Sequence, residues 1–245
     1  MGLCMGQLYP DFLFENFIRD ESNSGAFTIA NMIAIGKLIK LPVVFYSGSG
    51  IGKTHLLHAI GNEALRCNPK LKVALFSAEY FATEYTTAMR NEELKAFRNR
   101  MQENQNIFMV DDFSFINNKP IIQEELFQVL KKQSENGCSI VLASSITVDA
   151  MMDWNKELRE WLLSGEIYTI TNPSPEARKL FLKRLLSKNE ITINDDLIEC
   201  FHQEVGSSFR ELEAAVLRVR ATANLYNTEL TVEFARKTLR ELAVR

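Results

Sequence analysis

Residues 41–62 read LPVVFYSGSGIGKTHLLHAIGN, and this stretch decides the fold. It starts with a short apolar run rich in β-branched and aromatic residues, crosses three closely spaced glycines and continues with apolar residues at helical spacing. A strand, a glycine-rich turn and a helix in this order are typical of a phosphate-binding loop. The usual pattern is G-x-x-x-x-G-K-[ST], and Ser47 stands at the position of its first glycine. A left-handed conformation at Ser47 would cost about 1–2 kcal/mol, so we expect a working but weakened nucleotide site.

The loop pattern assigns a chemical role to each of its residues. Backbone N–H groups of a glycine-rich turn converge on a polyphosphate, with the N-terminus of the following helix behind them. A lysine at a helix N-terminus opposes the helix macrodipole, so a bound anion is the natural reason for Lys53. Thr54, the next residue, would hold Mg²⁺. We therefore expect the phosphate contacts to come from Ser49, Gly50, Ile51, Gly52, Lys53, Thr54 and His55.

The composition of the 245 residues, with 46% hydrophobic and 24% charged, is that of a soluble globular protein. A net charge of -3 argues against a surface that coats nucleic acid by bulk charge, so any DNA contact must be confined to a local basic patch. Four widely spaced cysteines fit a reducing compartment. The first residues lack the pattern of an export signal, and no apolar stretch is long enough to span a bilayer. We expect a cytoplasmic protein without a membrane segment.

The chain changes its pattern near Asn172-Pro173. Before that point, apolar β-rich runs alternate with helical segments, which indicates a parallel sheet covered on both faces. After it come four helix starts with capping residues and no further strand. We expect an N-terminal linker over residues 1–24, an α/β nucleotide-binding domain over 25–172 and a small helical domain over 173–245. The expected strands lie at residues 41–46, 72–77, 106–112, 139–145 and 166–171.

Three charged residues outside the loop complete the candidate site. The run NIFMVDD ends an apolar strand with two adjacent carboxylates, which is costly unless a cation lies nearby. After a phosphate loop, Asp111 is expected to reach Mg²⁺ and Asp112 to orient and deprotonate an attacking water. Arg210 lies in the first turn of a helix that a Ser-x-x-Glu box caps, where it could contact a γ-phosphate. A solvated acidic turn and a surface arginine are the alternatives.

Several longer segments, spread over nearly the whole chain, resemble the AAA+ core of the bacterial DnaA family. They are YPDFLFENFI, GSGIGKTHLLHAIGN, VDDFSFI, QEELFQVL and FRELEAAVLRV. The resemblance implies a three-layer P-loop AAA+ fold with a five-stranded parallel sheet, followed by an all-helical lid. It also implies ATP or ADP with Mg²⁺ between the two, with adenine near residues 14–23. The implied function lies in the initiation of chromosomal DNA replication or its regulation, with an initiator or the chain itself as partner.

Two departures from the family pattern affect the expected chemistry. Ser145 stands where the family has an aspartate that senses the γ-phosphate, and Trp161 stands at its arginine finger, with Arg159 two residues earlier. Loss of a finger predicts slow, Mg²⁺-dependent ATP hydrolysis. The alternative is a nucleotide-gated adaptor of the Hda type with little or no ATPase activity, and a weaker one is a helicase-loader-like protein. Because the chain stops where the family's lid ends, a fragment of an initiator and a naturally short relative both stay open.

Two further partners are suggested by local patterns. Gln7-Leu8, in QLYPDF, resembles the clamp-binding peptide of Hda-like proteins but also aligns with the initiator's own linker. A second stretch interleaves aromatic residues with cations and would suit single-stranded or origin DNA, because cations track the backbone while aromatics stack on bases. An amphipathic helix with a buried aromatic face is the equal alternative. The cations proposed for DNA are Arg90, Lys95, Arg98 and Arg100.

Overall fold

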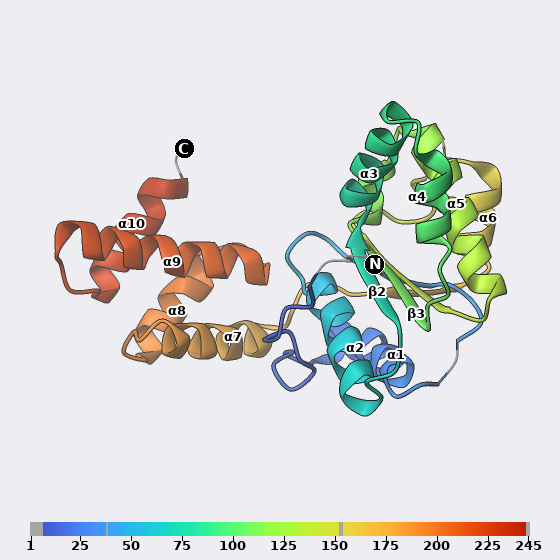
Figure 1. Cartoon of the computed structure of the whole chain (residues 1–245). Coiled ribbons are helices and arrows are strands. Elements are labelled where there is room, and N and C mark those ends of the chain that lie inside the picture. Colours follow the sequence, from blue (N-terminus) through green and yellow to red (C-terminus); the bar gives the residue numbers. More distant parts are fainter. Residues whose placement is uncertain (1–6, 38, 152–153, 244–245) are drawn as a thin grey trace. The chain divides into compact units, whose positions relative to one another are not determined.

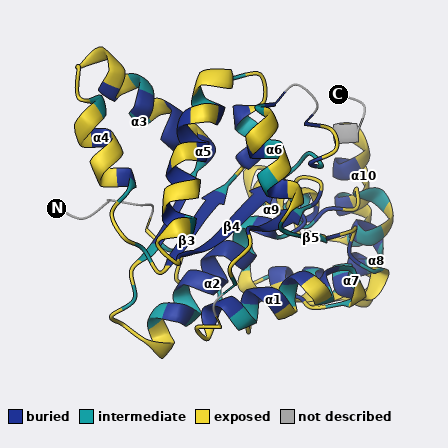
Figure 2. Cartoon of the chain, turned by 90° about the vertical axis from the view of Figure 1, so that its right-hand side faces the viewer, coloured by how far each residue is buried: buried dark blue, intermediate teal, exposed yellow. Residues whose placement is uncertain are grey.

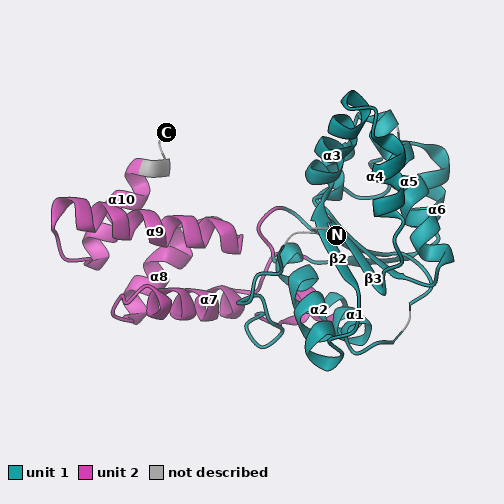
Figure 3. Cartoon of the chain, in the orientation of Figure 1, with its two compact units in different colours: residues 1–17, 25–48, 52–170 teal, residues 18–24, 49–51, 171–245 magenta. Residues whose placement is uncertain are grey.

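The computed structural model describes residues 7–37, 39–151 and 154–243, and the chain forms two compact units (Figures 1 and 3). The first unit comprises residues 1–17, 25–48 and 52–170, and the second comprises residues 18–24, 49–51 and 171–245. The second unit thus includes three residues of the glycine-rich loop. Within the described ranges, no helix combines the length and the apolar character that crossing a membrane requires.

A five-stranded sheet forms the centre of the first unit, in the order β2-β3-β4-β1-β5, and every pair of neighbours is parallel. The predicted α/β fold with a parallel five-stranded sheet is therefore confirmed. Tyr46 pairs with Ser144, so β1 and β4 end at the same level. Ser77 pairs with Asp111 in the same way. The strands are β1 (Val43–Tyr46), β2 (Val73–Ser77), β3 (Ile107–Asp111), β4 (Ser139–Ser144) and β5 (Glu166–Thr169).

Helices cover both faces of the sheet, with α1 and α2 on one face and α5 and α6 on the other (Figures 1 and 2). The central strands are almost fully buried, which explains why they are apolar along their whole length. The core over β3 and β4 is rich in aromatic residues, including Phe81, Phe97 and Phe108. The helices of this unit are α1 (Ser24–Ala34), α2 (Lys53–Cys67), α3 (Ala78–Arg90), α4 (Leu94–Met101), α5 (Pro120–Glu135) and α6 (Lys156–Leu163). Two short 3-10 helices are η1 (Glu21–Asn23) and η2 (Phe113–Ile116).

The second unit has its own apolar core, formed by helices whose starts follow the capping residues in the sequence. The Ser174 side chain accepts from the N–H of Ala177, and Asn194 accepts from the N–H of Asp196. Thr231 accepts from the N–H of Phe234. The core includes Leu182, Phe201, Leu212 and Val216. The helices are α7 (Pro175–Lys188), α8 (Asp195–Glu204), α9 (Phe209–Tyr226) and α10 (Val232–Ala243).

Residues 7–17, which belong to the predicted linker, pack along α2. The backbone N–H of Tyr9 donates to Nδ1 of His58 over 3.2 Å. His55 donates from Nε2 to the carbonyl of Leu13 over 2.8 Å, and its ring stacks on Phe12 with 4.8 Å between the centroids. Both histidines of the loop helix therefore hold the N-terminal segment.

His58 gives this packing a pH dependence. Burial, reinforced by the nearby His55, lowers the pKa of His58 from 6.5 to about 4, and its Nδ1 accepts a hydrogen bond only when unprotonated. The stabilisation is therefore complete above pH 6.5 and is lost as the pH falls towards 4, by at most about 1.4 kcal/mol per pH unit. Urea denaturation at pH 7.5, 5.5 and 4.5 measures the loss.

The matched variant is His58→Asn, whose side-chain oxygen keeps an acceptor near the position of Nδ1 but does not titrate. We expect its stability to fall less steeply with acid than that of the unchanged chain. Equal slopes in the two proteins would show that His58 does not control the acid response.

Candidate functional site

Ser47 anchors the start of the glycine-rich loop. Its N–H donates to the carbonyl of Ser144 over 3.2 Å, which continues the pairing of β1 with β4 by one residue. Positive φ values within the loop occur at Gly50 and Gly52, whereas Ser47 has an ordinary backbone conformation. The expectation of backbone strain at Ser47 was therefore wrong, because the turn places its left-handed residues further along.

Lys53, the first residue of α2, lies over the same end of the loop. Its Nζ donates to the carbonyl of Ser47 over 2.8 Å, to the Ser47 Oγ over 3.1 Å and to the carbonyl of Gly48 over 2.9 Å. Only 8% of Lys53 is exposed. A glycine at position 47 would lack the hydroxyl, so Ser47 adds an acceptor for a nearly buried ammonium. The sequence pattern presented Ser47 as a flaw and gave no signal of this contact.

Thr54 and Asp111 meet at the carboxyl end of β3. The Thr54 Oγ1 donates to the Asp111 Oδ2 over 2.7 Å, and the N–H of Asp112 donates to the Asp111 Oδ1 over 2.8 Å. Burial raises the pKa of Asp111, and these two hydrogen bonds oppose that shift. Asp112 is exposed and has a left-handed conformation, with φ of 51°. The structure therefore brings the two residues predicted to hold a metal into direct contact.

The donor atoms of this pair suit Mg²⁺. A hydroxyl and a carboxylate supply hard oxygen ligands, and protein sites for Mg²⁺ typically use one or two such groups, with waters and phosphates completing the shell. Among the described residues, no three His, Cys, Asp or Glu side chains cluster as a metal site.

Two serines that follow the carboxyl ends of β3 and β4 form a pair. The hydroxyls of Ser114 and Ser145 are 2.6 Å apart. Ser145 directly follows Ser144, the residue whose carbonyl binds the start of the loop, and Ser114 belongs to the 3-10 turn that begins after Asp112. The serine predicted at the sensor position is thus paired with a neutral partner. Sequence reasoning missed Ser114, although only Phe113 separates it from the acidic pair.

Arg210 contacts the loop residues that belong to the second unit. Its Nη1 donates to the Ser49 Oγ over 2.8 Å, and its N–H donates to the carbonyl of Gly50 over 3.4 Å. A Cβ at Gly50 would lie 2.6 Å from the Cβ of Arg210, so this approach requires glycine. The cap of α9 is the predicted box, in which Ser208 and Glu211 bond reciprocally.

Other candidate residues are engaged elsewhere. Arg159 donates to the carbonyl of Val148 over 3.3 Å, and Trp161 packs on Phe127 with 6.0 Å between the ring centroids. Ile51 is buried in the loop, and His55 is held by the N-terminal segment. These side chains have structural contacts within the described residues.

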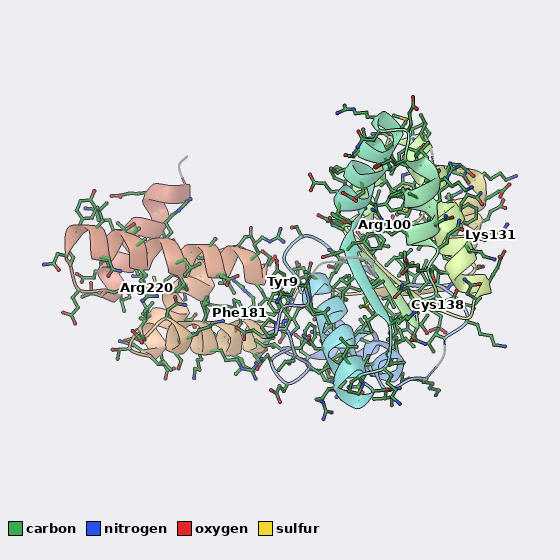
Figure 4. The ribbon with its side chains drawn as sticks, viewed as in Figure 1. Tyr9, Arg100, Lys131, Cys138, Phe181 and Arg220 are labelled. Atoms are coloured by element: carbon green, nitrogen blue, oxygen red, sulfur yellow. The ribbon has the colours of Figure 1, made fainter. Side chains whose placement is uncertain are left out.

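The residues considered for single-stranded DNA fall into two groups. The aromatics Phe81, Tyr85 and Phe97 are buried. Arg98 forms two hydrogen bonds of 2.7 Å with Glu125, and Arg100, on α4 (Figure 4), forms one of 3.0 Å with Glu84. Arg90 and Lys95 are exposed and form no ion pair with the described part of the chain. The segment therefore has the packing of an amphipathic helix pair.

Strand order, the loop after β1, the acidic pair after β3 and the helical unit that follows define a P-loop protein of the AAA+ class. Residues 8–168, more than half of the chain, match the family model for the bacterial DnaA ATPase domain. The chain belongs to the bacterial DnaA family.

Individual relatives agree with this assignment. The chromosomal replication initiator protein DnaA of Herpetosiphon aurantiacus is 35% identical over 236 residues, which are 96% of this chain and 50% of that protein. The chain thus spans about half the length of the curated relatives it matches. The crystal structure of domain III of Thermotoga maritima DnaA is similar with a TM-score of 0.88 at 26% identity, covering 96% of this chain and 98% of that one. AMPPCP-bound DnaA from Aquifex aeolicus has a TM-score of 0.76 at 26% identity, covering 87% and 66%.

The contact between Ser47 and Lys53 should contribute to the stability of the folded chain. Ser47→Ala removes one acceptor of a nearly buried ammonium and keeps the backbone, so we expect a loss of about 1–2 kcal/mol in the free energy of unfolding. The control is Gly48→Ala, since a Cβ at Gly48 would meet no atom within 4 Å. Urea denaturation without nucleotide measures both variants. Equal stability of Ser47→Ala and the unchanged chain would contradict the role given to the hydroxyl.

Proposed function

We propose that this chain binds ATP and ADP with Mg²⁺, hydrolyses ATP slowly and acts in the initiation of chromosomal DNA replication or its regulation. The observation that carries the proposal is the 2.7 Å hydrogen bond between Thr54 and Asp111, beside a lysine that lies over the loop. The similar DnaA structure from Aquifex aeolicus that binds AMPPCP supports the nucleotide assignment.

The phosphate and metal roles follow from the contacts. Lys53 and the N–H groups of the loop bind phosphate oxygens, since the lysine already lies among acceptors at the start of the loop. Thr54 and Asp111 would hold Mg²⁺, whose chemical contribution is to neutralise phosphate charge. A nearby cation also favours the ionised form of Asp111, which burial disfavours.

Asp112 and Arg210 take the remaining roles. Asp112 is exposed next to Asp111, and its carboxylate orients a water and accepts its proton. Arg210 contacts the γ-phosphate, and its guanidinium is directed at Ser49 of the loop. Ser49, Gly50, Ile51 and Gly52 contribute backbone contacts to the phosphates.

Slow hydrolysis is proposed because the groups that would accelerate the reaction are replaced by neutral residues or held by other contacts. Arg159 donates to the carbonyl of Val148, and the half-buried Trp161 packs on Phe127. Ser145 offers a neutral hydroxyl that is already paired with Ser114. The same observations favour the second candidate, a nucleotide-held adaptor of the Hda type without turnover.

Clamp binding through Gln7-Leu8 would require a rearrangement. Leu8 packs so closely on α2 that a Cβ at Gly61 would lie 2.8 Å from its Cδ2. Asn62 also donates to the carbonyls of Tyr9 and Phe12, over 2.9 and 3.0 Å. The clamp could receive Leu8 only after this segment leaves α2. We therefore propose an initiator or a second copy as the protein partner.

The main test separates binding from turnover. Lys53→Ala is expected to weaken ATP binding at least a hundredfold, because it removes the cation of the phosphate site. Asp112→Asn keeps a residue type that tolerates the left-handed conformation, so ATP binding should stay within about threefold while turnover falls at least a hundredfold. Calorimetry and phosphate release measure the two quantities. Retained turnover in either variant would contradict the roles assigned to these residues.

The two candidate functions differ in what partners do. Phosphate release is measured for the chain alone and after adding a full-length initiator or single-stranded DNA. Turnover that rises on addition, and is lost in Asp112→Asn, supports the slow ATPase. Tight binding without turnover under every condition supports the adaptor.

For single-stranded DNA we propose phosphate contacts by Arg90 and Lys95 alone, because the aromatics are buried and the other cations are paired. Changing both to alanine should reduce the salt dependence of DNA binding by about 1.4 in log–log slope, which corresponds to two phosphate contacts. The control is the double change Lys131→Ala and Lys132→Ala on α5, where Lys131 is labelled in Figure 4. An equal effect of the two double variants would show that only net charge matters.

A further inference from the structure

Arg178, on α7, holds the backbone that leads from α8 into α9. Its Nη2 donates to the carbonyls of His202, Val205 and Gly206, over 3.2, 3.0 and 2.9 Å. His202 lies in the last turn of α8, so a cation there is favourable for the helix dipole and for carbonyls without helical partners. The Nε of Arg178 is buried and has no partner among the described residues. The guanidinium is therefore placed by these three carbonyls.

The held backbone runs directly into the cap of α9. Gly206 lies two residues before Ser208, and a Cβ at Gly206 would come within 2.6 Å of the Glu211 carboxylate. Glu211 accepts from the N–H of Ser208 over 2.9 Å, and the N–H of Glu211 donates to the Ser208 Oγ over 3.2 Å. The loop and the cap are thus packed against each other, so a shift of the 205–207 backbone would move the first turn of α9.

Arg210 lies inside this cap, between Ser208 and Glu211 in sequence. Its direction towards Ser49 is given by the first turn of α9, and its own N–H reaches the carbonyl of Gly50. Only Phe209 separates the capping residue Ser208 from Arg210. The direction of the Arg210 side chain therefore depends on the path of the loop that Arg178 holds.

We propose that Arg178 is a positioning residue for Arg210. It fixes the 205–208 backbone by its contacts with three carbonyls and so directs the Arg210 guanidinium to the side of Ser49. The inference rests on the proposed function, in which Arg210 contacts the γ-phosphate. Its consequence is that Arg178, which does not contact nucleotide, controls how strongly the chain prefers ATP over ADP.

The test measures dissociation constants of a non-hydrolysable ATP analogue and of ADP for the full chain. Arg178→Gln is expected to lower the preference for the ATP analogue about tenfold, as Arg210→Ala does, because displaced charge loses its phosphate contact. The double variant should lose no more than Arg210→Ala alone, since both changes act through one contact. Hydrogen exchange of the amides of residues 208–212 should become faster in Arg178→Gln.

The matched control is Lys179→Gln. Lys179 neighbours Arg178 on α7 and forms an ion pair with Glu199 of α8 at 2.7 Å. Within the described residues, no hydrogen bond or ion pair joins it to the loop before α9. This variant should keep the nucleotide preference unchanged while losing the same charge.

If Arg178→Gln unfolds, Arg178→Lys replaces it, with an expected loss of about threefold, because an ammonium keeps the charge and fewer of the hydrogen bonds.

The outcomes separate the inference from the function on which it rests. A lowered preference in Arg210→Ala with an unchanged preference in both Arg178 variants overturns the inference and leaves the proposed function intact. An unchanged preference in Arg210→Ala contradicts the contact of Arg210 with the γ-phosphate, and it overturns the inference as well. A lowered preference in Lys179→Gln equal to that in Arg178→Gln overturns the inference as well, because charge loss alone would explain both.

Discussion

The parallel alignment of β1, β4 and β3 is the constraint on which the rest of the site depends. The hydrogen bond from the N–H of Ser47 to the carbonyl of Ser144 continues the β1–β4 pairing into the loop. Since β3 pairs with β4 in the same direction, Asp111 ends near the level at which the loop begins. The contact between Thr54 and Asp111 is therefore a result of strand register, and a shift along β3 would separate them.

Two buried or half-buried charged groups, Lys53 and Asp111, lie at this end of the sheet. Lys53 donates to three uncharged oxygen acceptors at the start of the loop, and its charge also favours the ionised form of Asp111. Asp111 has two hydrogen bonds, yet burial still raises its pKa. Burial of an ionised group is costly unless it is paired with an opposite charge. A phosphate anion beside Lys53 and a cation beside Asp111 would reduce both costs, so the proposed ligands complement the site electrostatically.

Local rules explain which parts of the fold and site could be predicted from the sequence. Apolar runs and turn residues locate the strands, and the Ser208-x-x-Glu211 pattern locates the start of α9, because each depends on neighbouring residues. The contact of Ser47 with Lys53, the Ser114–Ser145 pair and the hold of Arg178 on the 202–206 carbonyls join segments through three-dimensional packing. No periodicity in the sequence encodes them. The supposed flaw at Ser47 shows this limit, since the pattern identified the position and misjudged its backbone.

The departures from the family pattern at Ser145 and Trp161 concern groups with one kind of task. Lys53, Thr54 and Asp111 would hold the ground-state nucleotide and its metal; all three are present, and Thr54 and Asp111 are in direct contact. Ser145 and Trp161 stand where a carboxylate and an arginine would act on the γ-phosphate as its charge is redistributed. Interactions that favour the transition state over the ground state raise turnover, whereas those that favour both equally only tighten binding. In the proposed function, losing the first kind while keeping the second would lengthen the lifetime of the bound nucleotide.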